Sequence, residues 1–345
     1  MAGFALFSLK DPSLLAFDAH RAASENLQRI YHIQRIPNDT QRRTILDDVT
    51  PEYLRDPFNH LFHTLRQEKV LRRLCFMGHY YLVSLEGSGY FSSQKGHCEQ
   101  CLERQNSRTG EITYAHQLPG GAIVCPEHAE VVPLCPEPIV KQDGSTKNDC
   151  ERNAAKRFLQ HLREDYPHVP FIITEDALSA NAPHIRELQR HHLHFILGVK
   201  PGDHTHLFDY VHTAHAQGKT TEFEQTENGV THRFRWLNDV PLNASNTDVR
   251  VNFLEYWEIN GDRVKHFSWI TDFVIRQANA PTLMGGGLAR WKIENETFNL
   301  GSKRRLWERM RGLLGDLPFA AMTDIWRALA FGFHLQGQII IHDTT

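Results

Sequence analysis

Three short apolar runs constrain the fold of this chain more than any other feature. They are YYLVSLE at residues 80–86, VPFIITED at 169–176 and LHFILGVK at 193–200. Runs of this length, rich in branched and aromatic residues, predict buried strands. Residues 148–166 and 181–191 precede the second and third runs. They have apolar residues on one side and charge on the other, so they predict helices. The alternation predicts neighbouring parallel strands joined by helices.

Two more strands are predicted between the first run and the first helix. Residues 112–124 and 130–134 contain β-type runs joined near a Cys-Pro-Glu-His turn. Residues 80–200 therefore predict three antiparallel strands extended by helix–strand units, which is a mixed sheet covered by helices. The predicted fold class is α/β.

The chain divides into four regions by the pattern of apolar and polar residues. Residues 1–76 have apolar positions at helical spacing and predict an N-terminal helical region, and residues 77–204 hold the first part of the α/β core. Residues 205–270 predict a β-rich insertion with hairpin turns at Asn228-Gly229 and Asn260-Gly261. Residues 271–345 return to a helical pattern.

Composition excludes some classes of protein. The 345 residues include 38 Lys plus Arg against 41 Asp plus Glu, a net charge of −3, so the chain is not a uniformly basic nucleic-acid binder. The sequence contains no apolar run of about 18 residues, which predicts no membrane span. The opening residues lack a signal-peptide pattern, so we expect a cytoplasmic location. The six cysteines then favour reduced thiols or a metal over disulfides.

Acidic residues follow the predicted strands. Glu86 ends the first apolar run, and Glu175 and Asp176 end the second. Since the carboxyl ends of neighbouring parallel strands open onto a common edge, these acids are expected to meet there, with Glu294 added from the helix predicted at 289–299. Three carboxylates around Mg²⁺ would suit phosphodiester chemistry. The alternative is that these acids are turn formers or helix caps.

A second metal site is predicted from cysteine spacing. Cys98 and Cys101 are grouped with His116, or with His97, as zinc ligands. Cys125 and His128 are left out because the length of a strand, on the order of 30 Å, separates them from the first pair. The alternative is that the cysteines are reduced packing residues.

Five segments resemble the DDE transposases of bacterial insertion sequences, and the resemblance extends over about residues 1–340. These segments are YYLVSLEGSGYFSS, KQDGSTKNDCERNAAKRFL, IITEDALSANAPHI, FILGVKPGDH and LARWKIENETFN. The resemblance implies a ribonuclease-H-like core with a β-rich insertion before the last catalytic acid. It also implies Mg²⁺ or Mn²⁺, hydrolysis at the ends of a mobile element, and strand transfer into target DNA in the bacterial cytoplasm.

The resemblance assigns roles to individual residues. Glu86, Asp176 and Glu294 take the positions of the catalytic, metal-binding acids. Arg290 also matches the family pattern, where it would bind a phosphate beside the metals. Lys200 and Lys292 are predicted to contact DNA from the same edge of the sheet, as is Lys303 from a basic run at 303–311. The implied partner is double-stranded DNA, both element ends and target, with a homodimer on the DNA as the assembly considered.

The chain departs from the family pattern at several positions. Glu86 stands where the family has aspartate, and Gly287 and Gly301 stand where it has a tyrosine and a lysine. A further helical segment is expected after Asn299, and a longer DNA-end-binding region at the N-terminus. The second hypothesis is therefore a catalytically impaired remnant that binds DNA without cutting it. A third is a zinc-binding interaction protein that uses the loop from Cys98 to Cys101.

Overall fold

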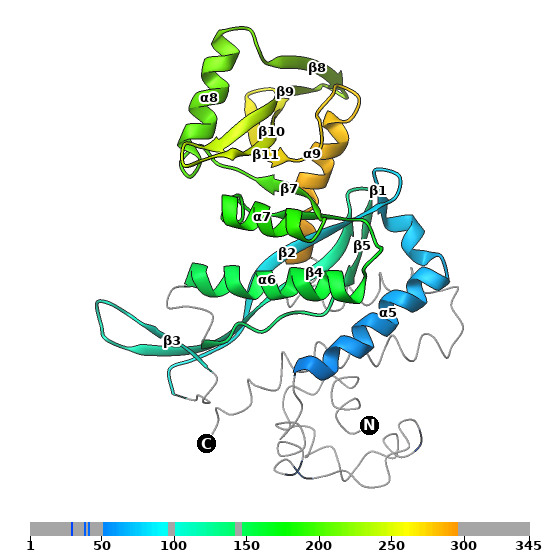
Figure 1. The fold of residues 1–345 in the computed structure, drawn as a ribbon, viewed down its shortest axis with the longest axis vertical. Coiled ribbons are helices and arrows are strands. Elements are labelled where there is room, and N and C mark those ends of the chain that lie inside the picture. The colour runs from blue at the N-terminus through cyan, green and yellow to red at the C-terminus, as the bar shows by residue number, and fades with distance from the viewer. Residues whose placement is uncertain are drawn as a thin grey trace.

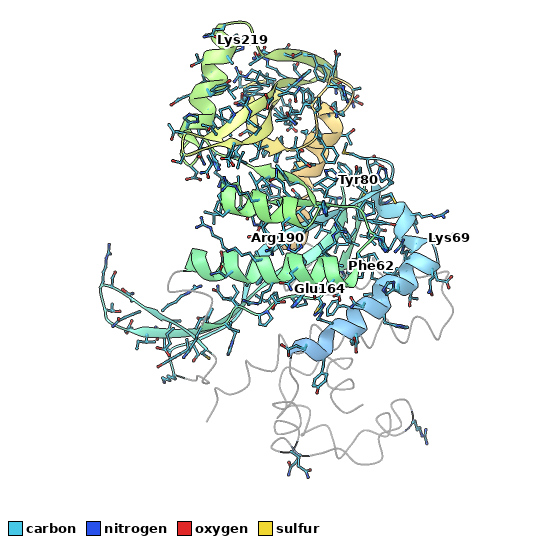
Figure 2. The ribbon with its side chains drawn as sticks, viewed as in Figure 1. Phe62, Lys69, Tyr80, Glu164, Arg190 and Lys219 are labelled. Carbon is cyan, nitrogen blue, oxygen red and sulfur yellow. The ribbon has the colours of Figure 1, made fainter. Side chains whose placement is uncertain are left out.

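A computed structural model describes residues 51–95, 101–141 and 147–295, together with Arg29, Asn38 and Gln41. The first described elements are the short 3₁₀ helix η1 (Pro51–Leu54), helix α5 (Arg55–Gln67), 3₁₀ helix η2 (Val70–Leu74) and strand β1 (Cys75–Phe76). Helix α5 buries Phe58, Leu61, Phe62 and Leu65, the spacing of one helical face. The ring of Phe62, labelled in Figure 2, packs against that of Tyr166, with 4.2 Å between the ring centroids.

A mixed sheet forms the centre of the molecule (Figure 1). Its first part contains β2 (Tyr80–Ser93), β3 (Leu102–Gln105), β4 (Ile112–Cys125), β5 (His128–Pro133), β6 (Phe171–Glu175) and β7 (His194–Gly198). Strand β4 is antiparallel to β2, while β6 is parallel to β2 and β7 is parallel to β6. Strands β3 and β5 pair with opposite ends of β4. The predicted α/β fold with a mixed sheet is confirmed, and β3 is an addition within the stretch expected to be a loop.

The predicted insertion continues this same sheet. Helix α8 (Thr205–Ala216) comes first, followed by β8 (Thr221–Glu227), β9 (Val230–Asn243), β10 (Asn246–Asn260) and β11 (Arg263–Thr271). Strand β11 pairs with β7, so the sheet order runs β3-β4-β2-β6-β7-β11-β10-β9-β8. The β-rich character is confirmed, while α8 was not predicted. Its buried residues Leu207, Phe208, Val211 and Ala214 do follow a helical spacing.

The two predicted hairpin turns differ in outcome. Asn228 and Gly229 both have positive φ, 51° and 79°, as a two-residue type I′ turn requires. In the second hairpin Asn260 pairs with Arg263, so the turn residues are Gly261 and Asp262, one position later than predicted. Gly261 alone takes the positive φ there, at 56°.

Helices cover the sheet on both faces. Helices α6 (Lys147–Asp165) and α7 (Ala182–Arg190) lie in front of the sheet in Figure 1, and α9 (Ala280–Leu288) lies behind it. The last described helix, α10 (Trp291–Ile293), contacts β2, β4 and β5. One apolar core extends through these layers and includes Phe171, Phe195 and Phe253. Within the described part of the chain, no helix is long and apolar enough to cross a membrane.

Candidate active site

Parallel pairing of β2 with β6 places Glu86 and Asp176 at equivalent positions. Ser84 pairs with Thr174, and each acid lies two residues further along its own strand direction. Because side chains alternate along a strand, the two acids belong to the same face of the sheet. Glu86 does not end its strand as predicted, since β2 continues to Ser93 and Glu86 pairs with Gly120 of β4. Strand β2 is longer because β4 supports it beyond the end of β6.

Arg290 brings the third predicted acid to the first. Its Nη1 donates a hydrogen bond to Oε2 of Glu86 at 2.6 Å and another to Oε1 of Glu294 at 2.7 Å. The hydroxyl of Ser84 donates to the main-chain oxygen of Arg290 at 2.9 Å, which ties the start of α10 to β2. The arginine side chain is only 11% exposed. Glu86 and Glu294, far apart in the sequence, therefore share one guanidinium nitrogen.

The pKa of Glu86 depends on burial and on the charged side chains around it. Burial is the largest cause that raises this pKa, and the nearby guanidinium of Arg290 opposes the rise. The carboxylates of Asp176, Glu294 and Glu175 also raise it, and the combined result is a pKa of about 7. A carboxyl that interacts with three others is the electrostatic signature of a site where one positive charge does not balance the acids. The structure thus joins Glu86 and Glu294 through Arg290, while Asp176 is close enough for its charge to raise the pKa of Glu86.

A pocket of about 190 Å³ opens beside these acids. Its walls come from the end of β6, the loop before α7, the middle of β2 and the first turns of α6. The lining residues include Glu86, Glu151, Arg152, Glu175, Asp176 and His184. Oε1 of Glu151 would lie 3.1 Å from a Cβ at position 87, so the glycine there leaves room for this side chain over β2.

Glu175 and His184 form a buried pair behind the pocket. His184 Nε2 lies 2.5 Å from Oε2 of Glu175, and the hydroxyl of Ser179 donates to Oε1 at 2.9 Å. Burial lowers the pKa of His184, but the charge and hydrogen bond of Glu175 outweigh this, so the pKa is raised. Asn181 caps α7 by accepting a hydrogen bond from the His184 amide. The sequence identified Glu175 as a strand-end acid but did not identify His184 as its partner.

The predicted DNA-binding lysines have different surroundings. Lys292 donates from Nζ to the main-chain oxygens of Cys125, Pro126 and His128, so its ammonium holds the β4–β5 turn instead of facing outward for a phosphate. The physical reason is that this turn leaves carbonyl groups without ladder partners. Lys200 is exposed just after β7. Lys303 lies outside the described residues, as do the neighbouring basic positions.

Close packing explains the glycine at position 287, where the resemblance predicts a tyrosine. A Cβ at this position would lie 2.3 Å from Nε1 of Trp269, so the indole fills the space that a side chain would need. Trp269 and Trp236 are buried, whereas Trp257 is partly exposed with the guanidinium of Arg235 5.0 Å from its ring centroid. Packing thus accounts for two of the three tryptophans in the insertion.

The proposed zinc ligands are partly described. Sγ of Cys101 lies 3.2 Å from Nε2 of His116, and both side chains are buried. Burial lowers the pKa of His116, which favours the neutral imidazole that a metal requires. Cys125 pairs with His128 at the opposite end of β4, in agreement with their exclusion from this group. Cys98 lies outside the described residues.

The acids fit a divalent cation in their chemistry, although their side chains are not arranged around one. Carboxylate oxygens are the hard donors that Mg²⁺ and Mn²⁺ prefer, and Asp176 and Glu294 both lie near enough to Glu86 to raise its pKa. Among the residues that the structure describes, no three His, Cys, Asp or Glu side chains are grouped closely enough to hold a metal ion. Arg290 lies between two of the acids instead.

Comparisons with known proteins leave the family open. No family model matches the chain, and no curated protein matches it. Among solved structures, one match is the crystal structure of the NurA nuclease from Sulfolobus solfataricus. It is 11% identical, with a TM-score of 0.30, over 88% of this chain and 98% of that one. A likeness this weak carries no argument about fold or function.

Proposed function

We propose that the chain is a DDE-type DNA transposase that cuts phosphodiester bonds at the ends of an insertion sequence and joins them to target DNA. The observation that carries this proposal is the contact of Glu86, from β2, and Glu294, from α10, with one guanidinium nitrogen of Arg290. Asp176, directly after β6, follows the strand position that pairs with Ser84, two residues before Glu86, and its charge raises the pKa of Glu86. Acids from three separate elements on one face of a sheet are typical of a metal-dependent phosphodiester site. The resemblance in five sequence segments points to the same three positions.

The order of the core strands supports a ribonuclease-H-like assignment. Strands β5, β4 and β2 are antiparallel neighbours, and β6 and β7 extend them in parallel with β2. This is the mixed sheet expected for such a core, with the β-rich segment inserted between β7 and the helix that bears Glu294. The insertion joins the edge of the sheet at β7.

Each residue has a definable role in the proposed reaction. Glu86, Asp176 and Glu294 would hold Mg²⁺ or Mn²⁺, which when bound activates water or a 3′-hydroxyl and neutralises the phosphate. Arg290 would bind a phosphate oxygen from beside the acids, because its guanidinium is already oriented towards them. Lys200 would contact the DNA backbone from the end of β7. We place the reaction on double-stranded DNA, with a homodimer as the assembly to be tested.

Asp176 gives the sharpest test. Purified full-length protein with Mn²⁺ or Mg²⁺ is expected to nick a duplex that carries the element's end, and Asp176→Asn to abolish nicking. Asp262→Asn, at the exposed β10–β11 turn, removes a carboxylate far along the chain from the three acids and is the matched control. Equal products from wild type and Asp176→Asn would refute the proposed chemistry.

A second candidate function is a remnant that binds DNA without cutting it. The observation in its favour is Glu86, which is one methylene longer than the expected aspartate and is engaged by Arg290. Metal-bound oxygens must be placed to within about 0.5 Å for catalysis, so the longer side chain alters the most sensitive part of the site. Binding to the same duplex without nicking at any metal concentration would favour this candidate.

A further inference from the structure

One guanidinium nitrogen occupies the position between two of the proposed metal ligands. Nη1 of Arg290 lies within hydrogen-bonding distance of Glu86 and Glu294 at once. A divalent cation that bound Oε2 of Glu86 and Oε1 of Glu294 together would lie between these two oxygens, where Nη1 of Arg290 lies. The guanidinium and the metal therefore compete for one position.

Several contacts hold Arg290 in this place. Ser84 fixes its main-chain oxygen. The ring of Trp291 lies beneath the guanidinium, with a centroid 4.3 Å from Cζ, and this tryptophan is 49% exposed. The arginine can thus keep a contact with the ring while its hydrogen bonds to the acids change. Each of the two carboxylates thus has a charge-assisted hydrogen bond without a metal ion.

We propose that Arg290 is a placeholder cation, which bridges Glu86 and Glu294 in the free protein and must leave before a divalent cation can bind between them. A DNA phosphate that takes the guanidinium frees the two carboxylates, so DNA binding favours metal binding. By thermodynamic linkage, metal binding favours phosphate binding to the same extent. This inference rests on the proposed function and adds an order of assembly to it.

Mn²⁺ binding without DNA tests the competition directly. The free Mn²⁺ signal in electron paramagnetic resonance measures the affinity of the full-length protein. Arg290→Gln is expected to raise that affinity at least about tenfold over wild type, because it removes the competitor. Arg152→Gln removes an equal charge from the wall of the pocket that Glu86 and Asp176 line, without a bridge between the acids, and is expected to raise the Mn²⁺ affinity by about threefold or less. An Arg290→Gln affinity equal to that of Arg152→Gln, or below wild type, overturns the proposal.

A second variant keeps the test decisive if Arg290→Gln does not fold. Trp291→Ala leaves both acids and the arginine in place and removes a half-exposed side chain. It loosens the guanidinium, so Mn²⁺ affinity is expected to rise about threefold. No change in Mn²⁺ affinity in Trp291→Ala, with Arg290→Gln unfolded, overturns the proposal.

The proposed function and the placeholder role fail in different ways. If wild type binds Mn²⁺ and Asp176→Asn removes that binding, but Arg290→Gln does not raise the Mn²⁺ affinity, only the proposed role of Arg290 is wrong. If neither wild type nor any of the variants binds Mn²⁺, the metal-dependent function is wrong and the placeholder role is wrong with it. A gain in Arg290→Gln that Glu294→Gln cancels supports both.

Discussion

Nε2 of His184 lies 2.5 Å from Oε2 of Glu175, and each side chain is only 5% exposed. This pair connects α7 to the last residue of β6, directly before Asp176. Removing one partner of a buried ion pair leaves the other charge unpaired in the interior. This destabilises a protein more than replacing both partners by apolar residues does. The free energy of unfolding should therefore depend strongly on His184.

We predict that His184→Ala lowers the free energy of unfolding by about 3–5 kcal/mol. His191→Ala, next to the end of α7, is the control, because its contact with Glu187 is less buried. Urea unfolding measures both. A loss below about 1 kcal/mol for His184→Ala would contradict a buried ion pair.

The His184 contribution should also depend on pH. Its pKa is raised above the ordinary 6.5, so the folded state holds the proton more tightly than the unfolded state. The stabilisation is complete below about pH 6.5 and is lost as the pH rises through the raised pKa. The difference in free energy of unfolding between wild type and His184→Gln should shrink from about pH 6 to pH 9. A difference that grows over this range would contradict the raised pKa.

Glu86 should also make the folded state less stable as the pH rises, because its pKa is raised as well. Its folded pKa of about 7 exceeds the ordinary 4.5, so ionising it costs the folded state free energy as the pH rises from 4.5 to about 7. Glu86→Gln removes this cost. With a chelator present, the free energy of unfolding of Glu86→Gln should increase relative to that of wild type across that range, by at most about 3 kcal/mol. A constant difference across the range would mean that the pKa is not raised.

The identity of the acid at position 86 separates the two proposed functions, a DNA-cutting enzyme and a remnant that only binds DNA. Glu86→Asp restores the shorter side chain of the family pattern, and if Glu86 impairs the metal site, the variant should nick DNA at least about tenfold faster than wild type. Nicking rates at saturating Mn²⁺ measure this. An unchanged or lower rate would show that glutamate is not what limits the chemistry.

Lys292 and Lys200 should have separable effects. Lys292→Met removes the ammonium group that donates to three main-chain oxygens. It is expected to lower the free energy of unfolding by about 1.5–3 kcal/mol. Lys200→Met, at an exposed position, should leave stability within about 0.5 kcal/mol and reduce the salt dependence of DNA binding by about one phosphate contact. The reverse pattern, with Lys292 affecting only DNA binding, would contradict the observed contacts.

The Cys101–His116 pair gives a metal prediction of its own. If the zinc hypothesis holds, the purified chain contains one zinc, and Cys101→Ser or Cys98→Ser loses it, whereas Cys75→Ser keeps it. Elemental analysis measures the content. Zinc retained at full occupancy in Cys101→Ser would exclude this grouping, and its absence from wild type would favour reduced packing cysteines.

Helix α9 shows why part of the fold could not be predicted from the sequence. Its sequence, APTLMGGGL, contains three glycines, which have low intrinsic helix propensity. The glycines are needed because the helix packs very closely on the sheet: a Cβ at Gly286 would lie 2.8 Å from Ile196 and from Phe76. Tertiary packing here overrides local preference, and no local pattern predicts it.

Local sequence alone predicted most of the strands, helices α6 and α7, and the acids at Glu86 and Asp176, because strand and helix periodicities extend over only a few residues. It did not predict β3, α8 or α9. It predicted that Glu86 and Asp176 would approach each other, since strand pairing and alternation fix which face a residue occupies. Only the tertiary structure decided the partners. Arg290 reaches Glu86 across 204 positions of sequence, and Lys292 meets the β4–β5 turn across more than 160. Such contacts depend on how whole elements pack, which no short pattern specifies.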